Sequence, residues 1–376
     1  MSAYVSAIET ATPSTVLDQE VTRDRFAAQP DISRLGERLI GACFNASGID
    51  TRHTVIAELS AEDTKEPPVF YDRESGELLN PGTQVRNDLY IRAAPGLYCE
   101  AAELALKASG GFAASDVTHV ITVSCTGFFA PGPDYLLVRR LGLTPSVQRY
   151  HIGFMGCYAS FPALRAAATI CAAEPEAVVL VVSAELCTLH VRTSNDPDQI
   201  VASSVFSDGA AAAVVSGRRP STRQPALSLD HFETVLTPTG EDDMAWTIGD
   251  HGFDMVLSTY VPHIIDENIA AAMAPLFASD SVLASRPYSD VDRWAIHPGG
   301  RSILDKVEST LNLSADQLAP SRQVLRDYGN MSSATVLYIL AHILRQPASA
   351  PERVCAMAFG PGLTVESALL TKEPGA

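Results

Sequence analysis

The feature that most constrains the fold is an alternation of two kinds of apolar segment along the chain. Short runs rich in Val and Ile alternate with Ala- and Leu-rich segments in which apolar residues recur with helical spacing. Such alternation is typical of α/β proteins, because helices must cover the faces of a mostly buried sheet. The predicted strands are residues 119–124, 177–183, 210–216, 293–296 and 354–359, and the predicted helices are 97–108, 134–141, 162–173, 303–311 and 332–344.

The chain length favours two closely packed halves. At 376 residues the chain exceeds one average domain, yet no linker or charge block divides it. The stretch "SGRRPSTRQPALS" at 216–228 is the best candidate for a seam, which predicts halves 1–220 and 221–376. Both halves end in similar strand-rich stretches, "FSDGAAAAVVSG" and "CAMAFGPGLTVESALL", which permits a duplicated fold. Residues 60–87 are polar and interrupted by Pro and Gly, so we expect an irregular surface segment there.

The composition excludes several classes of protein. The formal net charge of −17 and the absence of Lys/Arg runs argue against a nucleic-acid partner. The start of the chain lacks a basic and apolar leader, and no long apolar run follows, so we expect a cytoplasmic protein without a membrane span. Seven cysteines without a C-x-x-C pair fit neither a disulfide framework nor a zinc site, which predicts reduced thiols and no metal.

One cysteine stands at a position where a nucleophile could form. In "YHIGFMGCYASFPALRAAA" (150–168), Cys157 follows a strand-like run and precedes the helix predicted near Pro162. A thiol at such a junction faces helix N–H groups, which can lower its pKa from about 8.5 into the range of about 3.5–7.5. The alternative is a buried small residue in a tight turn, since free cysteine is among the most buried residue types.

Two further residues complete a set of groups suited to thioester chemistry. His297 follows an apolar strand in "WAIHPGGRSILDKVE", and Asn330 stands in a turn before a helix in "YGNMSSATVLYIL". Each alone is more often structural, because a Gly-Asn pair usually forms only a turn. Together, a thiol, an imidazole and an amide are the groups that acyl transfer through a thioester requires.

These residues lie in motifs that resemble a known family. The motifs are "PGPDYLLVRRLGLTPSVQRY" (131–150), "GCYA" (156–159), "FSDGAAAAVV" (206–215), "IHPGG" (296–300), "YGNMSSA" (328–334) and "FGPGLTVE" (359–366). In their order and spacing, the chain resembles the type III polyketide synthases of the chalcone and stilbene synthase superfamily along nearly its whole length. The resemblance implies a thiolase fold, in which two similar halves form a five-layered αβαβα core, and a homodimer.

The resemblance also implies the chemistry. Cys157 would accept an acyl group from acyl-CoA, with His297 paired to its thiolate. His297 and Asn330 would then donate hydrogen bonds to the oxyanion that forms when malonyl-CoA loses CO2; losing one such donor typically costs about 10²–10³ in rate. Repeated extension and cyclisation would give a pyrone, a resorcinol or a related aromatic product. No metal or bound cofactor is implied, because coenzyme A enters only as the carrier of the substrates.

The resemblance assigns a further set of residues to the substrate cavity. Phe206 corresponds to a gatekeeper phenylalanine, and Ser332 follows the catalytic asparagine. Several positions depart from the plant enzymes. Met255 stands where those enzymes have a second gatekeeper ring, and Trp246 stands where they have a glycine. Cys125 and His190 replace threonines of the cavity, and Ala130 replaces a methionine that crosses the dimer interface. These departures resemble bacterial members, which use aliphatic acyl-CoA or malonyl-CoA alone. Arg52 and Arg301 are candidates for binding the CoA phosphates at the tunnel mouth.

Other classes of protein remain open from the residues alone. An initiating ketoacyl-acyl-carrier-protein synthase and an HMG-CoA synthase also use Cys, His and Asn. A papain-like cysteine protease has the same chain order, and His297 lies 140 residues after Cys157, within the spacing of about 130–150 of that class. The sequence around Cys157 is not the protease form, however. A non-catalytic binding protein of the same fold is a further alternative.

Overall fold

The computed structural model describes residues 3–60, 67–219 and 224–375. Within these residues the main sheet has nine strands in the order β13-β14-β15-β10-β1-β9-β8-β6-β7. The N-terminal half contributes β1 (Ala3–Ala11), β6 (His119–Ser124), β7 (Gln148–Gly153), β8 (Val178–Leu186) and β9 (Asp208–Ser216). The C-terminal half contributes β10 (Ala226–Leu236), β13 (Arg293–Ile296), β14 (Glu352–Gly360) and β15 (Thr364–Glu373).

The two halves repeat one pattern of strand pairing. In the first half β6 pairs parallel with β8, which pairs antiparallel with β9, which pairs antiparallel with β1. In the second half β13 pairs parallel with β14, and β14, β15 and β10 follow antiparallel in the same way. Within the described strands, the half-sheets pair with each other where residues 3–5 of β1 meet residues 227–229 of β10. The predicted duplication is therefore confirmed, with β7 as an extra edge strand in the first half.

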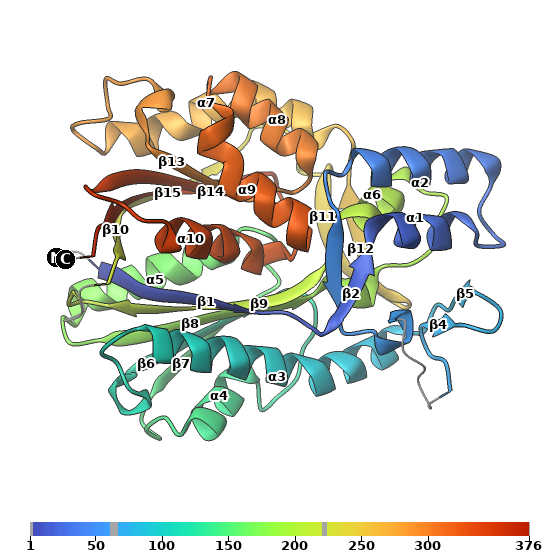
Figure 1. The fold of residues 1–376 in the computed structure, drawn as a ribbon, viewed down its shortest axis with the longest axis horizontal. Helices are drawn as coiled ribbons and strands as arrows, with labels where there is room; N and C mark the ends of the chain where they lie inside the picture. Colours follow the sequence, from blue (N-terminus) through green and yellow to red (C-terminus); the bar gives the residue numbers. More distant parts are fainter. Residues whose placement is uncertain (1–2, 61–66, 220–223, 376) are drawn as a thin grey trace.

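Helices and sheets alternate in layers (Figure 1). Across the described residues the order is α3 and α4, the first half-sheet, α5 and α10, the second half-sheet, and an outer group of α7, α8 and α9. This confirms the predicted five-layered α/β core. The helices are α3 (Thr83–Ala108), α4 (Pro133–Leu141), α5 (Ser160–Ala173), α7 (Val261–Ala278), α8 (Arg301–Thr310), α9 (Ala315–Tyr328) and α10 (Thr335–Arg345).

The middle layer explains why the two halves are not separately packed domains. Leu164 and Ala167 of α5 and Leu340 of α10 belong to one buried cluster with strand residues of both half-sheets, such as Val179 and Ala356. Both helices are apolar on nearly every side, because each has a sheet on either face. The change from one half to the other falls between β9 and β10; residues 220–223 of the predicted seam lie outside the described residues, and the boundary at 220/221 stays a prediction.

Two predicted helices differ at their starts. The helix predicted at 97–108 begins at Thr83, inside the segment expected to be irregular, and contains Pro95. Proline removes one backbone hydrogen bond, but the buried Tyr90, Ala94 and Leu97 keep one face of the helix in the core. The helix predicted at 332–344 begins at Thr335, after the 3-10 turn Ser332–Ala334. The other predicted helices and all the predicted strands are found within a few residues of the expected bounds.

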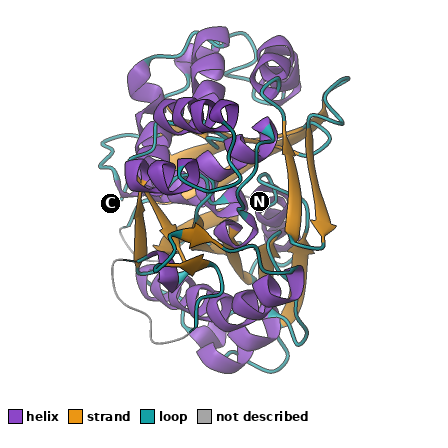
Figure 2. Cartoon of the chain, turned by 90° about the vertical axis from the view of Figure 1, so that its right-hand side faces the viewer, coloured by secondary structure: helices purple, strands orange, loops and turns teal. Residues whose placement is uncertain are grey.

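Smaller elements gather at one end of the layers, at the right of Figure 1 and facing the viewer in Figure 2. They include a hairpin of β11 (Met244–Gly249) and β12 (Gly252–Leu257), which pairs apart from the main sheet. Also here are α1 (Gln19–Ala27), α2 (Arg34–Ala46), α6 (Pro197–Val205), β2 (Thr15–Asp18), β3 (Thr51–Thr54), β4 (Tyr71–Asp72) and β5 (Glu77–Leu78). No helix within the described ranges is long and apolar enough to span a bilayer.

Candidate active site

Cys157 lies in the turn between β7 and α5. Gly156 before it has φ 88°, and a Cβ at Gly156 would come within 2.4 Å of Pro361 Cδ. Only glycine therefore permits this backbone conformation and this close approach. The Cys157 side chain is almost wholly buried and lines a cavity of 410 Å³.

His297 and Asn330 line the same cavity as Cys157. His297 follows β13, and Asn330 follows α9, so the two residues come from different segments of the C-terminal half. Both side chains are 1% exposed. The structure thus brings together the three residues that the sequence grouped as a thioester site.

The Asn330 amide is held in one orientation. Its Oδ1 accepts a hydrogen bond from Ser332 N at 2.8 Å, so Nδ2 is the donor that remains. Nδ2 donates only a long bond of 3.4 Å to Gly299 O. The backbone of Asn330 forms a bridge with Phe206, in which Asn330 N donates to Val205 O and Ser207 N donates to Asn330 O, each at 2.9 Å. The end of α6 therefore fixes the position of this donor.

The His297 ring has no hydrogen-bond partner for Nδ1 or Nε2 among the described residues. Burial lowers the pKa of His297 to about 3, so the imidazole is neutral near pH 7. A neutral imidazole carries one N–H donor and one nitrogen acceptor. The ring can therefore offer either group to a molecule that enters the cavity.

Burial opposes the low pKa that was expected for Cys157. Burial, together with the charge of Glu185, raises the pKa of the thiol to about 12, although a hydrogen bond with Ser332 acts in the opposite direction. Because His297 is neutral as well, the thiolate has no positive partner among the described residues. Burial therefore favours the neutral forms of both groups, and the ion pair stays a prediction.

The walls of the 410 Å³ cavity come mainly from α2, α6, the hairpin and the starts of α7 and α8. The predicted gate residues Phe206 and Met255 both line it. Arg301, at the start of α8, also lines it and is half-exposed, with Asp305 at 4.0 Å. Its predicted place at the mouth therefore agrees with the structure.

The prediction for Arg52 is wrong. The side chain is 1% exposed and lines neither cavity that Cys157 lines. Its Nη1 donates to Ser203 O at 2.8 Å and Phe206 O at 2.7 Å, at the end of α6. β3 directs this residue inward because its neighbours Thr51 and His53 occupy the opposite face of the strand. Arg52 cannot meet a CoA phosphate at the surface.

A second, much smaller cavity of 20 Å³ also borders Cys157. Cys125, Ser332, Trp246 and Met255 line it, as the sequence predicted for a substrate cavity. The Cys125 thiol is held by a hydrogen bond from Gly156 N at 3.0 Å. In this structure the space beyond the nucleophile is therefore nearly filled by side chains.

Trp246 fills it as part of an aromatic cluster. The Trp246 indole donates to Cys125 O at 2.9 Å and meets His190 and Phe253 edge to face. His190 stacks on Phe253 with ring centroids 4.0 Å apart. Its Nδ1 accepts a hydrogen bond from Phe253 N at 3.1 Å, so Nε2 donates to Thr126 O at 2.7 Å. His190 lies behind Trp246 and lines a 10 Å³ void, but neither of the cavities that Cys157 lines.

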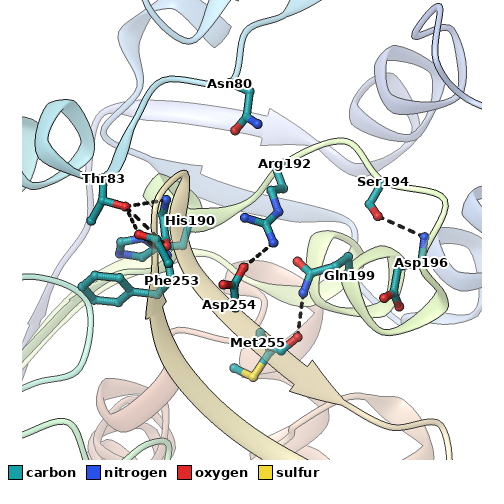
Figure 3. Close-up of polar contacts among 12 residues, drawn as sticks. Asn80, Thr83, His190, Arg192, Ser194, Asp196, Gln199, Phe253, Asp254 and Met255 are labelled. Atoms are coloured by element: carbon teal, nitrogen blue, oxygen red, sulfur yellow. Dashed lines mark hydrogen bonds and ion pairs between the residues drawn. The ribbon is translucent and has the colours of Figure 1, made fainter.

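Polar contacts fasten the hairpin that carries Trp246 and Met255 (Figure 3). Gln199 Nε2 donates to Met255 O at 2.7 Å, and Arg192 forms an ion pair with Asp254. Thr83, at the start of α3, accepts a hydrogen bond from Gly252 N at 2.8 Å. The hairpin is thus tied to α3, to α6 and to the segment before α6.

Sequence reasoning missed Glu185, a buried carboxylate at the end of β8. It accepts hydrogen bonds from Cys125 N at 2.9 Å, from Thr126 Oγ1 at 2.9 Å and from Ser333 Oγ. It therefore ties the loop that carries Cys125 to the turn that carries Ser332. The signal was a glutamate in an otherwise apolar strand, "VVLVVSAEL". Among the described residues, no group of three or more His, Cys, Asp or Glu side chains could hold a metal ion.

Comparison with known proteins identifies the family. The model of the chalcone and stilbene synthase N-terminal domain matches residues 1–220, and that of the C-terminal domain matches residues 229–374. Bisdemethoxycurcumin synthase of Oryza sativa subsp. japonica is 34% identical over 388 residues, covering 98% of this chain and 92% of that protein.

Solved structures agree. A polyketide synthase of the brown alga Ectocarpus siliculosus has a TM-score of 0.88 at 30% identity, covering 99% of this chain and 98% of that chain. The 1,3,6,8-tetrahydroxynaphthalene synthase of Streptomyces coelicolor has a TM-score of 0.83 at 28% identity, covering 99% and 100%. These matches decide against the protease, ketoacyl synthase and HMG-CoA synthase alternatives. The chain belongs to the chalcone and stilbene synthase family and is a type III polyketide synthase, an acyltransferase that condenses acyl units.

Proposed function

We propose that Cys157, His297 and Asn330 carry out acyl loading and decarboxylative condensation in this polyketide synthase. The observation that supports this assignment best is the meeting of a thiol, an imidazole and an oriented amide in one buried cavity. His297 is the most telling of the three, since its ring nitrogens have no partner in the described part of the chain. A buried polar group without a partner costs free energy, and a functional site is where such a cost is tolerated.

In the loading step, a neutral thiol and a neutral imidazole act together. As Cys157 Sγ attacks the carbonyl carbon of an acyl-CoA, its proton moves to one ring nitrogen of His297. The C–S bond to coenzyme A breaks, and the departing CoA thiolate takes the proton from the imidazolium. The acyl group remains on Cys157 as a thioester, and His297 returns to its neutral form.

In the extension step, His297 and Asn330 act as donors. Malonyl-CoA loses CO2, and the electron pair of the broken C–C bond forms an enolate whose oxygen accepts hydrogen bonds from a His297 N–H and from Asn330 Nδ2–H. The enolate carbon attacks the thioester carbonyl, a C–C bond forms, and Cys157 leaves as thiolate and is reprotonated. The Asn330 amide is prepared for this role, because Ser332 N already holds its oxygen.

The cavity walls support an aliphatic starter or malonyl-CoA alone. Val201, Leu257, Val261 and Ile265 give the 410 Å³ cavity an apolar wall that suits an aliphatic chain, beside hydroxyl side chains such as Ser204 and Thr259. With only 20 Å³ beyond Cys157, a long product must displace Trp246 or Met255 or occupy the larger cavity. We therefore propose small cyclised products of the pyrone or resorcinol type.

Coenzyme A is proposed to enter along α8. Arg301 joins the 410 Å³ cavity to an open groove of 1120 Å³ between α1, α2 and α9. Arg322 and Arg326 also line this groove, but each already has an acidic partner, such as Asp305 at 2.8 Å from Arg322. Arg301 also has an acidic neighbour, but at 4.0 Å from Asp305 its contact is longer than the 2.8 Å and 2.7 Å of these pairs, so Arg301 is the cation that we assign to a CoA phosphate.

A homodimer is proposed from the edge of the first half-sheet. β7 pairs with β6 on one side and carries the exposed Tyr150. Phe128 and Met155, also partly exposed, lie at the ends of β6 and β7. An unpaired edge with apolar side chains favours association with a second copy. The exposed Ala130, predicted to face that interface, lies in the same loop as Phe128. The cytoplasmic location stays a prediction.

The catalytic assignment is tested by acyl loading. Incubated with an aliphatic acyl-CoA, the wild-type protein should gain the mass of one acyl group on the peptide that contains Cys157. Cys157→Ala should lose this adduct and all condensation, whereas Cys125→Ala, which alters the adjacent thiol, should keep the adduct. An adduct at the parental level in Cys157→Ala would show that another residue is the nucleophile.

A further inference from the structure

A third cavity, of 50 Å³, contains an unusual concentration of positive charge. It lies between α1, the β2–β3 pair and residues 188–192, and it shares no lining residue with the two cavities that Cys157 lines. Most of its wall is apolar, yet Arg25, Arg52 and Arg192 all line it. Among its described lining residues there is no Asp or Glu. Three arginines therefore line one small space in a chain whose net charge is −17.

Arg52 is the residue whose hydrogen bonds are incomplete. Its Nη1 is used by the carbonyls of Ser203 and Phe206. Its Nε and Nη2 are buried and have no partner in residues 3–60, 67–219 and 224–375. The edge formed by Nε–H and Nη2–H is the one with which arginine holds a carboxylate or another anion by two parallel hydrogen bonds.

The neighbouring charges do not neutralise Arg52. Asp208 raises its pKa through charge, but the Asp208 oxygens are taken up by Val55 N at 2.9 Å, Thr188 N at 2.8 Å and Thr188 Oγ1 at 2.6 Å. Arg192 has its own partner in Asp254 (Figure 3). Buried charges in proteins are normally paired, because an isolated one is expensive to desolvate. Arg52 therefore keeps two unused donors among the described residues, although its Cζ lies 5.5 Å from the Phe44 ring centroid.

We propose that this cavity binds a small inorganic anion, of the size of chloride or bicarbonate, against the Nε–Nη2 edge of Arg52. A cavity of 50 Å³ has room for such an ion, since about 10–15 Å³ is enough for one water molecule. Arg25, whose Nη1 donates to Leu59 O, also lines the cavity and adds positive potential. The apolar remainder of the wall strengthens these interactions by excluding water.

The bound anion would stabilise the turn that precedes Asn330. Arg52 holds Phe206 O, and Phe206 forms the backbone bridge to Asn330. The stem of Arg52 also packs against Gly329, where an added Cβ would lie 2.9 Å from Arg52 Cγ. Fixing the guanidinium therefore fixes the end of α6 and the turn before Asn330, so we expect the anion to raise stability.

The first test locates the ion. Crystals of the full chain grown in sodium bromide should show an anomalous scattering peak within hydrogen-bonding distance of Arg52 Nε and Nη2. In solution, the melting temperature should be higher in sodium chloride than in sodium gluconate of equal ionic strength. At a tenfold excess over the dissociation constant, the expected rise is roughly 2 °C for a chain of this length. A parallel series in sodium bicarbonate distinguishes the two ions.

Two variant pairs assign the effect to this cavity. Leu17 lies opposite Arg52 in the β2–β3 pair and lines the cavity, so Leu17→Phe should fill the space and abolish the chloride-dependent rise, while Leu17→Met should keep it. Arg52→Lys should also abolish it, whereas the exposed Arg139→Lys should not. No bromide peak in the wild type, together with equal melting temperatures in chloride, bicarbonate and gluconate, would overturn the proposal. None of these measurements depends on condensation activity.

Discussion

Two histidines in this protein are equally buried but have opposite hydrogen-bonding situations. His190, in the aromatic wall, and His297, in the cavity, are 4% and 1% exposed, and burial lowers the pKa of each to about 3. His190 uses both ring nitrogens, one towards Phe253 N and the other towards Thr126 O. His297 uses neither within the described residues. Burial alone therefore does not distinguish a structural histidine from a functional one.

This difference in hydrogen bonding separates a structural region of the site from a functional one. The cluster of His190, Trp246 and Phe253 is internally satisfied and holds its ring orientations, so it shapes space without taking part in proton transfer. The cavity around His297 keeps donors and acceptors available for a substrate. A tautomer fixed by two hydrogen bonds cannot switch between accepting and donating a proton, but an imidazole without such bonds can.

Replacing His297 should give the largest effect. His297→Ala removes the base of the loading step and one oxyanion donor, so condensation should fall by at least about 10²–10³. Its melting temperature should change little, since no hydrogen bond of the described chain is lost. Steady-state product formation and thermal unfolding measure the two effects. His263→Ala, at a half-exposed helix position, is the control, and a rate within threefold of the wild type in His297→Ala would contradict the assignment.

The protonation state of the site can be read from alkylation of Cys157. Because the thiolate is the reactive form and burial raises the thiol pKa to about 12, the iodoacetamide rate at Cys157 should rise with pH. We expect about tenfold per unit between pH 7 and 10, as the thiolate fraction does below the pKa. Peptide mass spectrometry follows Cys157 apart from the other six cysteines. A rate that is already constant above pH 7 in the wild type but not in His297→Ala would restore the ion pair.

Replacing His190 should affect stability more than chemistry. His190→Phe keeps the stacking on Phe253 but leaves Phe253 N and Thr126 O buried without partners, which should cost about 2–4 kcal/mol of unfolding free energy. Urea unfolding measures this cost. His263→Phe, half-exposed, should stay within about 0.5 kcal/mol of the wild type. A His190→Phe protein of wild-type stability would show that the two bonds contribute nothing.

The stability contributed by His190 also depends on pH. Its pKa is lowered from 6.5 to about 3 in the folded protein. The stabilisation is therefore fully present above pH 6.5 and is lost as the pH falls towards 3, because the unfolded chain binds the proton first. In His190→Phe, the loss of unfolding free energy over this pH range should be smaller than in the wild type.

Trp246 should control how far a product can extend. Trp246→Gly joins the 20 Å³ and 10 Å³ voids that the indole now lines, so we expect longer products or bulkier starters in product mass spectra. The stability cost should stay below the roughly 3–5 kcal/mol of a fully buried ring, because Trp246 is only half-buried. Trp246→Phe keeps most of the bulk and should keep the product pattern. A large loss of stability with unchanged products would make Trp246 a packing residue only.

Met255 should give the smallest effect. A phenylalanine there replaces a flexible thioether by a rigid ring at the junction of the two Cys157 cavities. We expect Met255→Phe to lower kcat/KM for bulky starters several-fold and to change that for small ones by less than about threefold, since less than 1 kcal/mol is at stake. Val256→Phe, on the outward face of the same strand, should change neither value. Equal losses for all starters would argue against a steric gate.

Much of the fold and the identity of the catalytic candidates could be read from the sequence. The alternation of apolar runs located β6, β8, β9, β13 and β14, because buried strands and covering helices leave a local periodicity. The short polar motifs pointed to Cys157, His297 and Asn330, since glycine-rich turns at strand ends are visible in the chain itself. Strands with mixed composition, such as β10, left no comparable pattern.

Only the tertiary structure decided what surrounds those residues. From the sequence, Arg52 was expected to be a surface cation. The sequence does not show that β3 directs its side chain towards Ser203 and Phe206, some 150 residues away in the chain. From the sequence, Cys157 was expected to be a thiolate, because its position before a helix is visible in the local sequence. Its pKa is raised by burial, which comes from segments distant in the chain. Local pattern determines secondary structure and residue type; charge state and hydrogen-bond partners depend on side chains that meet only in the folded protein.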